Sequence, residues 1–401
     1  MSNQAFSNLP APKADAILAL MGKFRADERP EKIDLGVGVY RDAEGATPVM
    51  RSVKAAQEKL VEEETSKTYV GPTGDSEFNA LLADLALGDS VTKERVASMQ
   101  TPGGSGALRV LFELVNEARP DATVWVSDPT WANHIPMLQA AGLTSKAYPY
   151  FDSASGSVRF DDMLEALRAC PTGDVVLLHA CCHNPTGANL TIEQWKQVGE
   201  VLIERGLLPY FDMAYQGFGD GFEEDAAGMQ LVASMVPECV IALSCSKNFA
   251  VYRDRVGAAV VVAANANDAK LALGQMGSIA RRSYSMPPNH GAAVVKGVLQ
   301  DAALKADWIK ELESMRLNML NLRTSLAKEL RRLSNSDRFD FLARHRGMFS
   351  RVGLTPAQVD WIREERAIYM VGDSRINIAG LPADKIEYVA AAIIDSLSNA
   401  D

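Results

Sequence analysis

The chain has 401 residues, of which 47% are hydrophobic and 23% are charged, close to the average for soluble globular proteins. This length corresponds to two or three ordinary domains, and the composition excludes intrinsic disorder and a small disulfide scaffold. With 41 basic and 51 acidic residues, the net charge is −10, and the chain lacks the basic excess expected of a nucleic-acid-binding protein.

The middle of the chain alternates predicted helices and strands. Leu108, Leu111, Phe112 and Val115 have helical spacing, and a glycine-rich turn at Thr101–Ala107 opens this helix. Continuous apolar runs separated by helices are typical of a parallel or mostly parallel sheet covered on both faces. The crossover helices are expected at Thr191–Glu204 and Asp225–Met235. The predicted buried strands are Thr123–Val126, Val175–Leu178, Leu207–Phe211, Val240–Leu243 and Ala258–Val262.

The C-terminal part has a different pattern. A long helix is predicted over Asp301–Leu333, strands at Gly347–Val352 and Ile376–Ala379, and a closing helix from about Ala383. We interpret this part as a second, smaller α+β domain that joins the N-terminal arm. The expected division is an N-terminal arm with part of the small domain (1–45), a large domain (46–314) and the remainder of the small domain (315–401).

The five cysteines are an odd number at no framework spacing, which predicts reduced thiols in a cytoplasmic protein. Residues Met1–Phe24 lack a basic start followed by an apolar core, so no signal peptide is expected. No run reaches the roughly 20 apolar residues of a membrane span. Cys181-Cys182-His183 lacks the C-x-x-C spacing and has no second cluster, so we expect no metal site.

Polar residues follow each apolar run, where ligands of open α/β sheets bind. The turn Gly103–Gly106 can place backbone N–H groups at a helix N-terminus, which favours an anion. It matches neither the dinucleotide fingerprint nor the P-loop, which argues against a nucleotide-binding oxidoreductase.

Two charged residues at strand ends have competing interpretations. Asp212 is either a helix cap or ion-pair partner, or a carboxylate that holds a protonated ring nitrogen. Lys247 is either a solvated surface charge or a desolvated amine with a lowered pKa that reacts with a carbonyl. Arginines suit carboxylate or phosphate recognition, with surface ion pairing as the alternative. The candidates are Arg255, Arg281 and Arg375.

Six motifs in order resemble the aspartate aminotransferase family, pyridoxal-phosphate enzymes of fold type I, subgroup alpha. The likeness runs from about Arg25 to about Ile394. The motifs are Ile33–Arg41, Thr101–Arg109, Cys182–Gly187, Asp212–Phe218, Ser244–Phe249 and Ser374–Gly380.

The resemblance implies the fold of that family, a mostly parallel central sheet covered by helices plus a smaller α+β domain. It implies pyridoxal 5'-phosphate as cofactor and three catalytic residues. Lys247 would hold the cofactor and move a proton at the substrate α-carbon, Asp212 would pair with the ring nitrogen, and Tyr215 would hydrogen-bond the ring oxygen. His134 and His179 would lie behind Asp212.

The same resemblance implies the remaining binding residues. The phosphate would be held by Gly104, Ser105, Ser244 and Arg255. Asn184 would bind the ring oxygen, Trp131 would stack on the ring and orient the substrate, and Arg375 would bind the substrate α-carboxylate.

The family's homodimer would share its active sites between subunits. Tyr69 would reach the phosphate of the neighbouring subunit, and Arg281 would cross to the distal carboxylate of a dicarboxylic substrate. The adjacent Arg282 is the alternative for this contact, although the residues Tyr284–Pro288 favour Arg281. Val37, Gly38 and Phe349 would line the substrate entrance.

The implied activity moves the amino group of L-aspartate, and of L-tyrosine or L-phenylalanine, to 2-oxoglutarate in a ping-pong cycle. The alternatives are an enzyme of the same subgroup that prefers aromatic amino acids, and a pyridoxal-phosphate lyase. Two arginines at opposite ends of the site suit dicarboxylates. Cys245 stands where a tyrosine is also common in the family.

Overall fold

The computed structural model describes residues 6, 9–11 and 16–399, so most of the first 15 residues of the predicted N-terminal arm lie outside it. A seven-stranded sheet forms the centre, in the order β2-β10-β9-β8-β7-β3-β4. Its strands are β2 (Val96–Pro102), β3 (Thr123–Asp128), β4 (Thr144–Pro149), β7 (Val175–His179), β8 (Leu208–Met213), β9 (Cys239–Ser244) and β10 (Val256–Val262).

The sheet confirms the predicted mostly parallel architecture. β4, β3, β7, β8 and β9 are parallel to their neighbours, and only β10 runs antiparallel, between β9 and β2. The register places His179 beside Asp212 at the carboxyl ends of β7 and β8. β2 and β4 were not predicted from apolar runs, because β2 mixes polar with apolar residues and β4 has only one buried residue, Tyr148.

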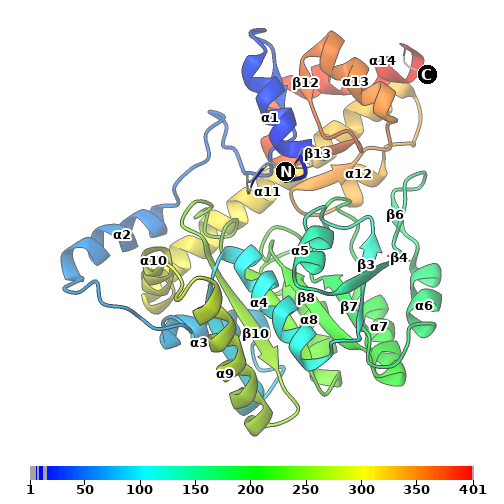
Figure 1. The fold of residues 1–401 in the computed structure, drawn as a ribbon. Coiled ribbons are helices and arrows are strands. Elements are labelled where there is room, and N and C mark those ends of the chain that lie inside the picture. The colour runs from blue at the N-terminus through cyan, green and yellow to red at the C-terminus, as the bar shows by residue number, and fades with distance from the viewer. Residues whose placement is uncertain (1–5, 7–8, 12–15, 400–401) are drawn as a thin grey trace.

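Helices cover both faces of the sheet (Figure 1). Successive residues of β10 belong to different cores: Ala258 and Val260 to one, Ala259 and Val261 to the other. One face carries α4 (Gly103–Ala118), α5 (His134–Ala140) and α9 (Ala266–Ser283). The other carries α3 (Ser76–Leu87), α6 (Phe160–Arg168), α7 (Ile192–Arg205), α8 (Glu224–Met235) and α10 (Asn289–Gln300).

The long helix α11 (Ala302–Ser334) connects the sheet layers to the C-terminal elements (Figure 1). Asp301 begins it by accepting hydrogen bonds from two backbone N–H groups of the first turn. Its buried residues up to Met319 belong to the core of the large sheet, and those from Leu322 onward belong to a separate core. The predicted boundary at 314/315 falls inside this helix.

The separate core joins both ends of the chain. α1 (Ala16–Ala26), blue in Figure 1, lies beside the orange and red C-terminal elements. β1 (Ile33–Asp34) pairs with β12 (Ile368–Tyr369), and β11 (Phe349–Arg351) pairs antiparallel with β13 (Arg375–Asn377). The helices of this region are α12 (Phe341–Arg344), α13 (Pro356–Arg366) and α14 (Ile386–Asn399).

The C-terminal strands differ from their predicted bounds. β11 covers only three of the six residues predicted as a strand at 347–352. β13 begins at Arg375 and gives way at Ile378 to a short 3-10 helix, because Ile378 and Leu381 close tight turns there.

Two further elements frame the site. α2 (Arg51–Glu63) packs on α10 and α11, and a short hairpin, β5 (Phe151–Asp152) and β6 (Ser157–Val158), follows β4. Among the helices that the structure describes, none combines the length and the apolar character needed to cross a membrane.

Candidate active site

A cavity of about 270 Å³ lies at the carboxyl ends of the central strands, where the polar residues were expected to meet. It brings together eleven of the predicted site residues: Gly38, Gly104, Ser105, Trp131, Asn184, Asp212, Tyr215, Ser244, Lys247, Arg255 and Arg375. These residues come from strands, loops and a helix up to 337 positions apart in the chain, counted from Gly38 to Arg375.

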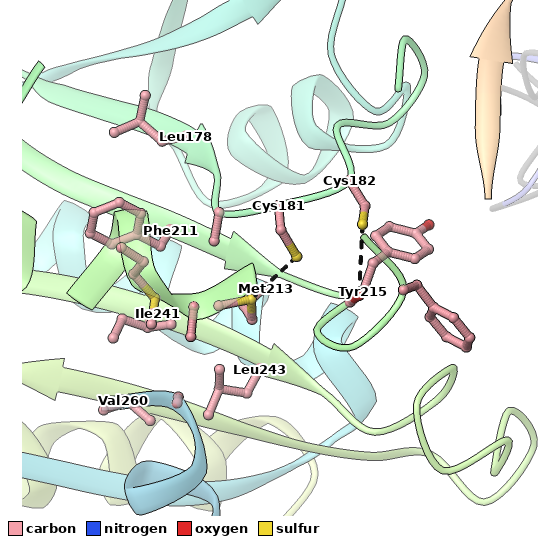
Figure 2. Packing of buried hydrophobic residues seen from close by; sticks show 14 of the residues in the cluster. Leu178, Cys181, Cys182, Phe211, Met213, Tyr215, Ile241, Leu243 and Val260 are labelled. Atoms are coloured by element: carbon pink, nitrogen blue, oxygen red, sulfur yellow. Dashed lines mark hydrogen bonds between the residues drawn. The ribbon is translucent and has the colours of Figure 1, made fainter. Parts of the chain in front are cut away.

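The floor of the cavity is formed where β7 and β8 end. Figure 2 shows Cys181 and Cys182 after β7 directed toward Met213 and Tyr215 after β8. The Cys181 thiol lies 3.6 Å from the sulfur of Met213, and the Cys182 thiol lies 3.8 Å from the carbonyl oxygen of Tyr215. These packed contacts hold the two strand ends together and keep Tyr215 at the cavity.

Asp212 is supported by a chain of hydrogen bonds behind it. His134 Nε2 donates to the carboxylate over 3.1 Å, and Thr130 bridges His134 Nδ1 at 2.8 Å to His179 Nε2 at 3.2 Å. Burial raises the pKa of the Asp212 carboxyl, but the hydrogen bond from His134 and the nearby positive charges, Lys247 among them, together outweigh burial and hold this pKa below its usual value. Burial lowers the pKa of His179 to about 3, so His179 stays neutral.

Lys247 has the properties of a reactive amine. Its ammonium nitrogen lies 4.7 Å from the centre of the Tyr215 ring. Removal from water lowers the pKa of Lys247 from 10.5 to about 8, although the Asp212 charge opposes the shift. A much larger fraction of this amine is therefore neutral at pH 7 than of an ordinary lysine, and only the neutral amine is a nucleophile.

One end of the cavity is an anion site. The N-terminus of α4, at Gly103 and Gly104, presents backbone N–H groups beside Arg255 and Ser244. A Cβ on Gly103 would lie 2.5 Å from a terminal guanidinium nitrogen of Arg255, and one on Gly104 would lie 2.8 Å from the Cβ of Ser244. Glycine at both positions is thus what lets the cation and the hydroxyl approach the helix end.

Arg255 is held in place at that end by its own neighbours. Its guanidinium donates to the carbonyl oxygen of Tyr252 over 2.8 Å, and its backbone has a φ of 55°. A non-glycine residue in this left-handed region is uncommon and costs conformational energy. The surrounding contacts therefore determine the conformation of Arg255, and in this conformation its guanidinium lines the cavity.

A second cation lies at the opposite side. Arg375 is buried and donates to the carbonyl oxygen of Gly36 over 2.8 Å and to the side-chain oxygen of Asn184 over 3.4 Å. Asn184 in turn donates to the Tyr215 hydroxyl over 3.4 Å. Arg255 and Arg375 thus place two cations in one cavity together with Lys247 and Asp212.

Three predicted binding residues do not line this cavity within the single chain: Val37, Tyr69 and Arg281. Tyr69 is 90% exposed, and Arg281 is exposed and donates to the Ser285 hydroxyl. Arg282 forms ion pairs with Glu113 and Glu117 of its own chain. Because Arg282 has partners within its own chain, Arg281 is the better candidate for a contact elsewhere.

Five further residues of the cavity were not predicted to line it: Ile17, Leu108, Ala214, Ser246 and Tyr252. Ser246 and Tyr252 flank the predicted Lys247 and Arg255 in the chain, so proximity to those motifs could have indicated them. Ile17 had no such signal, because α1 reaches the cavity only through the pairing of β1 with the C-terminal β12.

Two other features lack the chemistry of this cavity. A larger cavity of about 480 Å³ lies at the amino ends of β9 and β8 and is lined mainly by apolar side chains such as Leu114, Val240 and Val261. The thiols of Cys181 and Cys182 lie near the Asp225 carboxylate. That carboxylate accepts three backbone N–H groups, from Gly217, Gly219 and Asp220, so its role is to close a turn.

The cavity's donors fit pyridoxal phosphate. A helix N-terminus, a serine hydroxyl and an arginine suit the phosphate, a carboxylate with a low pKa suits a protonated ring nitrogen, and an amine of lowered pKa suits the aldehyde. The indole of Trp131 and the methyl group of Ala214 provide nonpolar surface in the same cavity.

Comparisons with known proteins agree with this fit. Residues 30–393 match the family model for class I and II aminotransferases. An aromatic-amino-acid aminotransferase of Paracoccus denitrificans is 55% identical over 97% of this chain and 98% of its own length. An aspartate aminotransferase of Escherichia coli is 43% identical over 97% and 99% of the two chains.

A solved structure resembles the whole fold as well. The aromatic-amino-acid aminotransferase of Burkholderia pseudomallei, covalently bound to pyridoxal phosphate, has a TM-score of 0.95 and 40% identity, and the match covers 98% of this chain and 100% of that one. The chain therefore belongs to the class I and II aminotransferase family, within the subfamily of aspartate and aromatic-amino-acid aminotransferases.

Proposed function

We propose that this protein is a pyridoxal-phosphate-dependent aminotransferase that prefers aromatic amino acids, also accepts L-aspartate, and passes the amino group to 2-oxoglutarate. The observation that carries the proposal is one cavity lined by Lys247, Asp212 and the two arginines Arg255 and Arg375. When bound, pyridoxal phosphate supplies a carbonyl that accepts the amino group and a ring that withdraws electrons from the substrate α-carbon.

Different residues of the cavity bind different parts of the cofactor. Ser244, Arg255 and the N-terminus of α4, with Gly104 and Ser105, bind the phosphate. Asp212, held charged by His134, keeps a proton on the ring nitrogen. Tyr215 and Asn184 bind the ring oxygen, and Trp131 stacks against the ring.

The proton transfer and the substrate contacts fall to two other residues. Lys247 moves the proton at the substrate α-carbon, for which an amine with a pKa of about 8 is well matched near neutral pH. Arg375 binds the α-carboxylate through its planar pair of N–H groups. Gly38 and Phe349 line the approach to this arginine.

The preference for aromatic substrates rests on the relatives. The aromatic-amino-acid aminotransferase of Paracoccus shares 55% of aligned residues, against 43% for the aspartate aminotransferase of Escherichia coli. This supports the aromatic alternative over the aspartate-first interpretation of the sequence. Retention of Arg281 is what supports continued use of aspartate.

We further propose a cytoplasmic homodimer with shared sites. Tyr69 and Arg281 are exposed in the single chain and lie outside its own cavity. In a dimer they would complete the partner's site, Tyr69 at the phosphate and Arg281 at the distal carboxylate. Sedimentation of the purified protein with and without pyridoxal phosphate tests the dimer directly.

The activity is tested with purified protein loaded with pyridoxal phosphate. We expect L-phenylalanine, L-tyrosine and L-aspartate each to yield an oxo acid in step with glutamate formed from 2-oxoglutarate, with kcat/KM highest for an aromatic substrate. A higher value for aspartate would refute the aromatic preference. Release of ammonia without glutamate would instead indicate a lyase.

A further inference from the structure

A buried cation lies outside the cavity, on α11. The Arg323 side chain is 1% exposed, and no carboxylate pairs with it among the residues that the structure describes. Burying a guanidinium without a carboxylate is costly, and burial lowers the pKa of Arg323 to about 9. The contacts of Arg323 must therefore stabilise a part of the structure enough to offset this cost.

Arg323 binds one short segment of chain. Its terminal nitrogens donate to the carbonyl oxygens of Gly347 and Phe349, both over 2.6 Å, and to the Ser350 hydroxyl over 2.5 Å. Hydrogen bonds from a charged donor are stronger than those between neutral groups. The three contacts fix the backbone on both sides of Phe349.

The same segment is held from the large domain. His345 Nε2 donates to the carbonyl oxygen of Gly156 over 2.7 Å, so its Nδ1 accepts the Ser350 hydroxyl at 3.0 Å. Burial lowers the pKa of His345 to about 3, which keeps this neutral form. The hydrogen bonds therefore form a continuous chain from α11 to the β5–β6 hairpin, through Arg323, Ser350, His345 and Gly156. Each group in this chain donates to the next one.

The Phe349 ring transmits the position of this backbone segment to Arg375, the cation proposed to bind the substrate. The guanidinium carbon of Arg375 lies 4.3 Å from the centre of the Phe349 ring, within the range of a cation–π contact. The tip of the ring is so close to Gly38 that a Cβ there would lie 2.7 Å from the ring carbon Cζ. A shift of the Phe349 backbone would thus move both the arginine and the entrance.

We propose that Arg323 is a positioning residue for substrate binding: through the backbone of Gly347–Ser350 it sets the Phe349 ring, and through that ring the orientation of Arg375. This inference rests on the proposed role of Arg375 at the substrate α-carboxylate. All amino-acid and oxo-acid substrates carry that carboxylate, so the effect of Arg323 is expected to be the same for dicarboxylic and aromatic substrates.

The experiment compares Arg323→Met with wild-type enzyme loaded with pyridoxal phosphate. We expect KM for L-aspartate and L-phenylalanine to rise by a similar factor of about tenfold, with a much smaller change in kcat. The dissociation constant of 3-phenylpropanoate, an unreactive carboxylate, should rise alongside, while pyridoxal phosphate still binds. Arg323→Lys, which keeps the charge but not the planar fork, should recover only part of the loss.

The control is Arg316→Met, on the same helix, which removes an ion pair with Glu313 and is expected to leave both KM values unchanged. Ser350→Ala removes one acceptor and should raise both KM values by a smaller factor; if Arg323→Met does not fold, this variant decides. Unchanged KM values in an active, folded variant, or a loss confined to one substrate, would overturn the proposal. An inactive wild-type enzyme would instead refute the proposed function.

Discussion

The guanidinium carbon of Arg375 lies 4.3 Å from the centre of the Phe349 ring, and the two residues come from paired strands, β13 and β11. The arginine is also bonded to Gly36 of the N-terminal segment and to Asn184 of the loop after β7. Three distant parts of the chain therefore meet at Arg375, the residue that we propose binds the substrate α-carboxylate.

Replacement of Lys247 by alanine should abolish turnover and leave the fold intact, because the side chain lines a cavity and its amine makes no hydrogen bond on which an element depends. We expect kcat to fall by at least about a thousandfold, the scale for loss of a nucleophile and proton carrier. Steady-state rates and circular dichroism check the two halves of this prediction. Turnover at the wild-type rate would remove Lys247 from the mechanism.

Lys247 should also make stability depend on pH in the cofactor-free protein. Its pKa falls from 10.5 unfolded to about 8 folded, so between these values the unfolded state binds more protons and stability rises with pH. Below pH 8 Lys247 is charged in both states, so the folded protein bears the full free-energy cost of holding this charge in the cavity. Lys247→Met should therefore raise the free energy of unfolding by about 2 kcal/mol. This is less than the pKa shift alone implies, because the cavity is partly open to solvent. Urea unfolding at pH 7 and above about pH 11 measures this difference, which should nearly vanish at the higher pH because Lys247 is then neutral in both states.

Replacement of His134 by phenylalanine should shift the acid side of the pH–activity profile. The hydrogen bond from His134 is the largest of the contributions that lower the Asp212 pKa against the effect of burial. Without it this pKa rises, the carboxyl protonates at higher pH, and activity is lost earlier on acidification. The profile of kcat/KM, with the exposed His290→Asn as control, tests this; an unshifted acid limb would contradict it.

Replacement of Gly103 by alanine should weaken cofactor binding. The residue has a φ of 72°, and its Cβ would lie 2.5 Å from a terminal nitrogen of Arg255. Displacement of Arg255 from the helix end should raise the dissociation constant of pyridoxal phosphate by about tenfold or more, the scale of one charge-assisted contact. Gly274→Ala on α9, where nothing lies within 4 Å of the added carbon, is the matched control in a spectroscopic titration.

Replacement of Arg281 by alanine should separate the two substrate classes. If Arg281 binds the distal carboxylate in the partner's site, kcat/KM for L-aspartate should fall by about 2–5 kcal/mol of transition-state binding, and that for L-phenylalanine much less. Arg282→Ala, which removes an ion pair with Glu117, should leave the ratio unchanged. Equal losses on both substrates would take Arg281 out of this role.

Local chemistry in the sequence determined the large domain and the cofactor end of the site. Buried strands such as β7 and β9 are continuous apolar runs, and Asp212 and Lys247 each follow such a run along the chain, whereas the glycine turn after β2 is marked by its own composition. Because parallel strands deliver their carboxyl ends to one edge, adjacency to a run was enough to place these residues together.

Only the tertiary structure showed the contacts between segments that are far apart in the sequence. β4 has a single buried residue, Tyr148, and no apolar run to mark it. Ile17 and Arg323 lie in helices whose sequence shows only ordinary helical patterning, yet one lines the cavity and the other is sealed against Gly347–Ser350. Their roles depend on which segments pack against them, a property of the folded chain that periodicity and motif spacing do not encode.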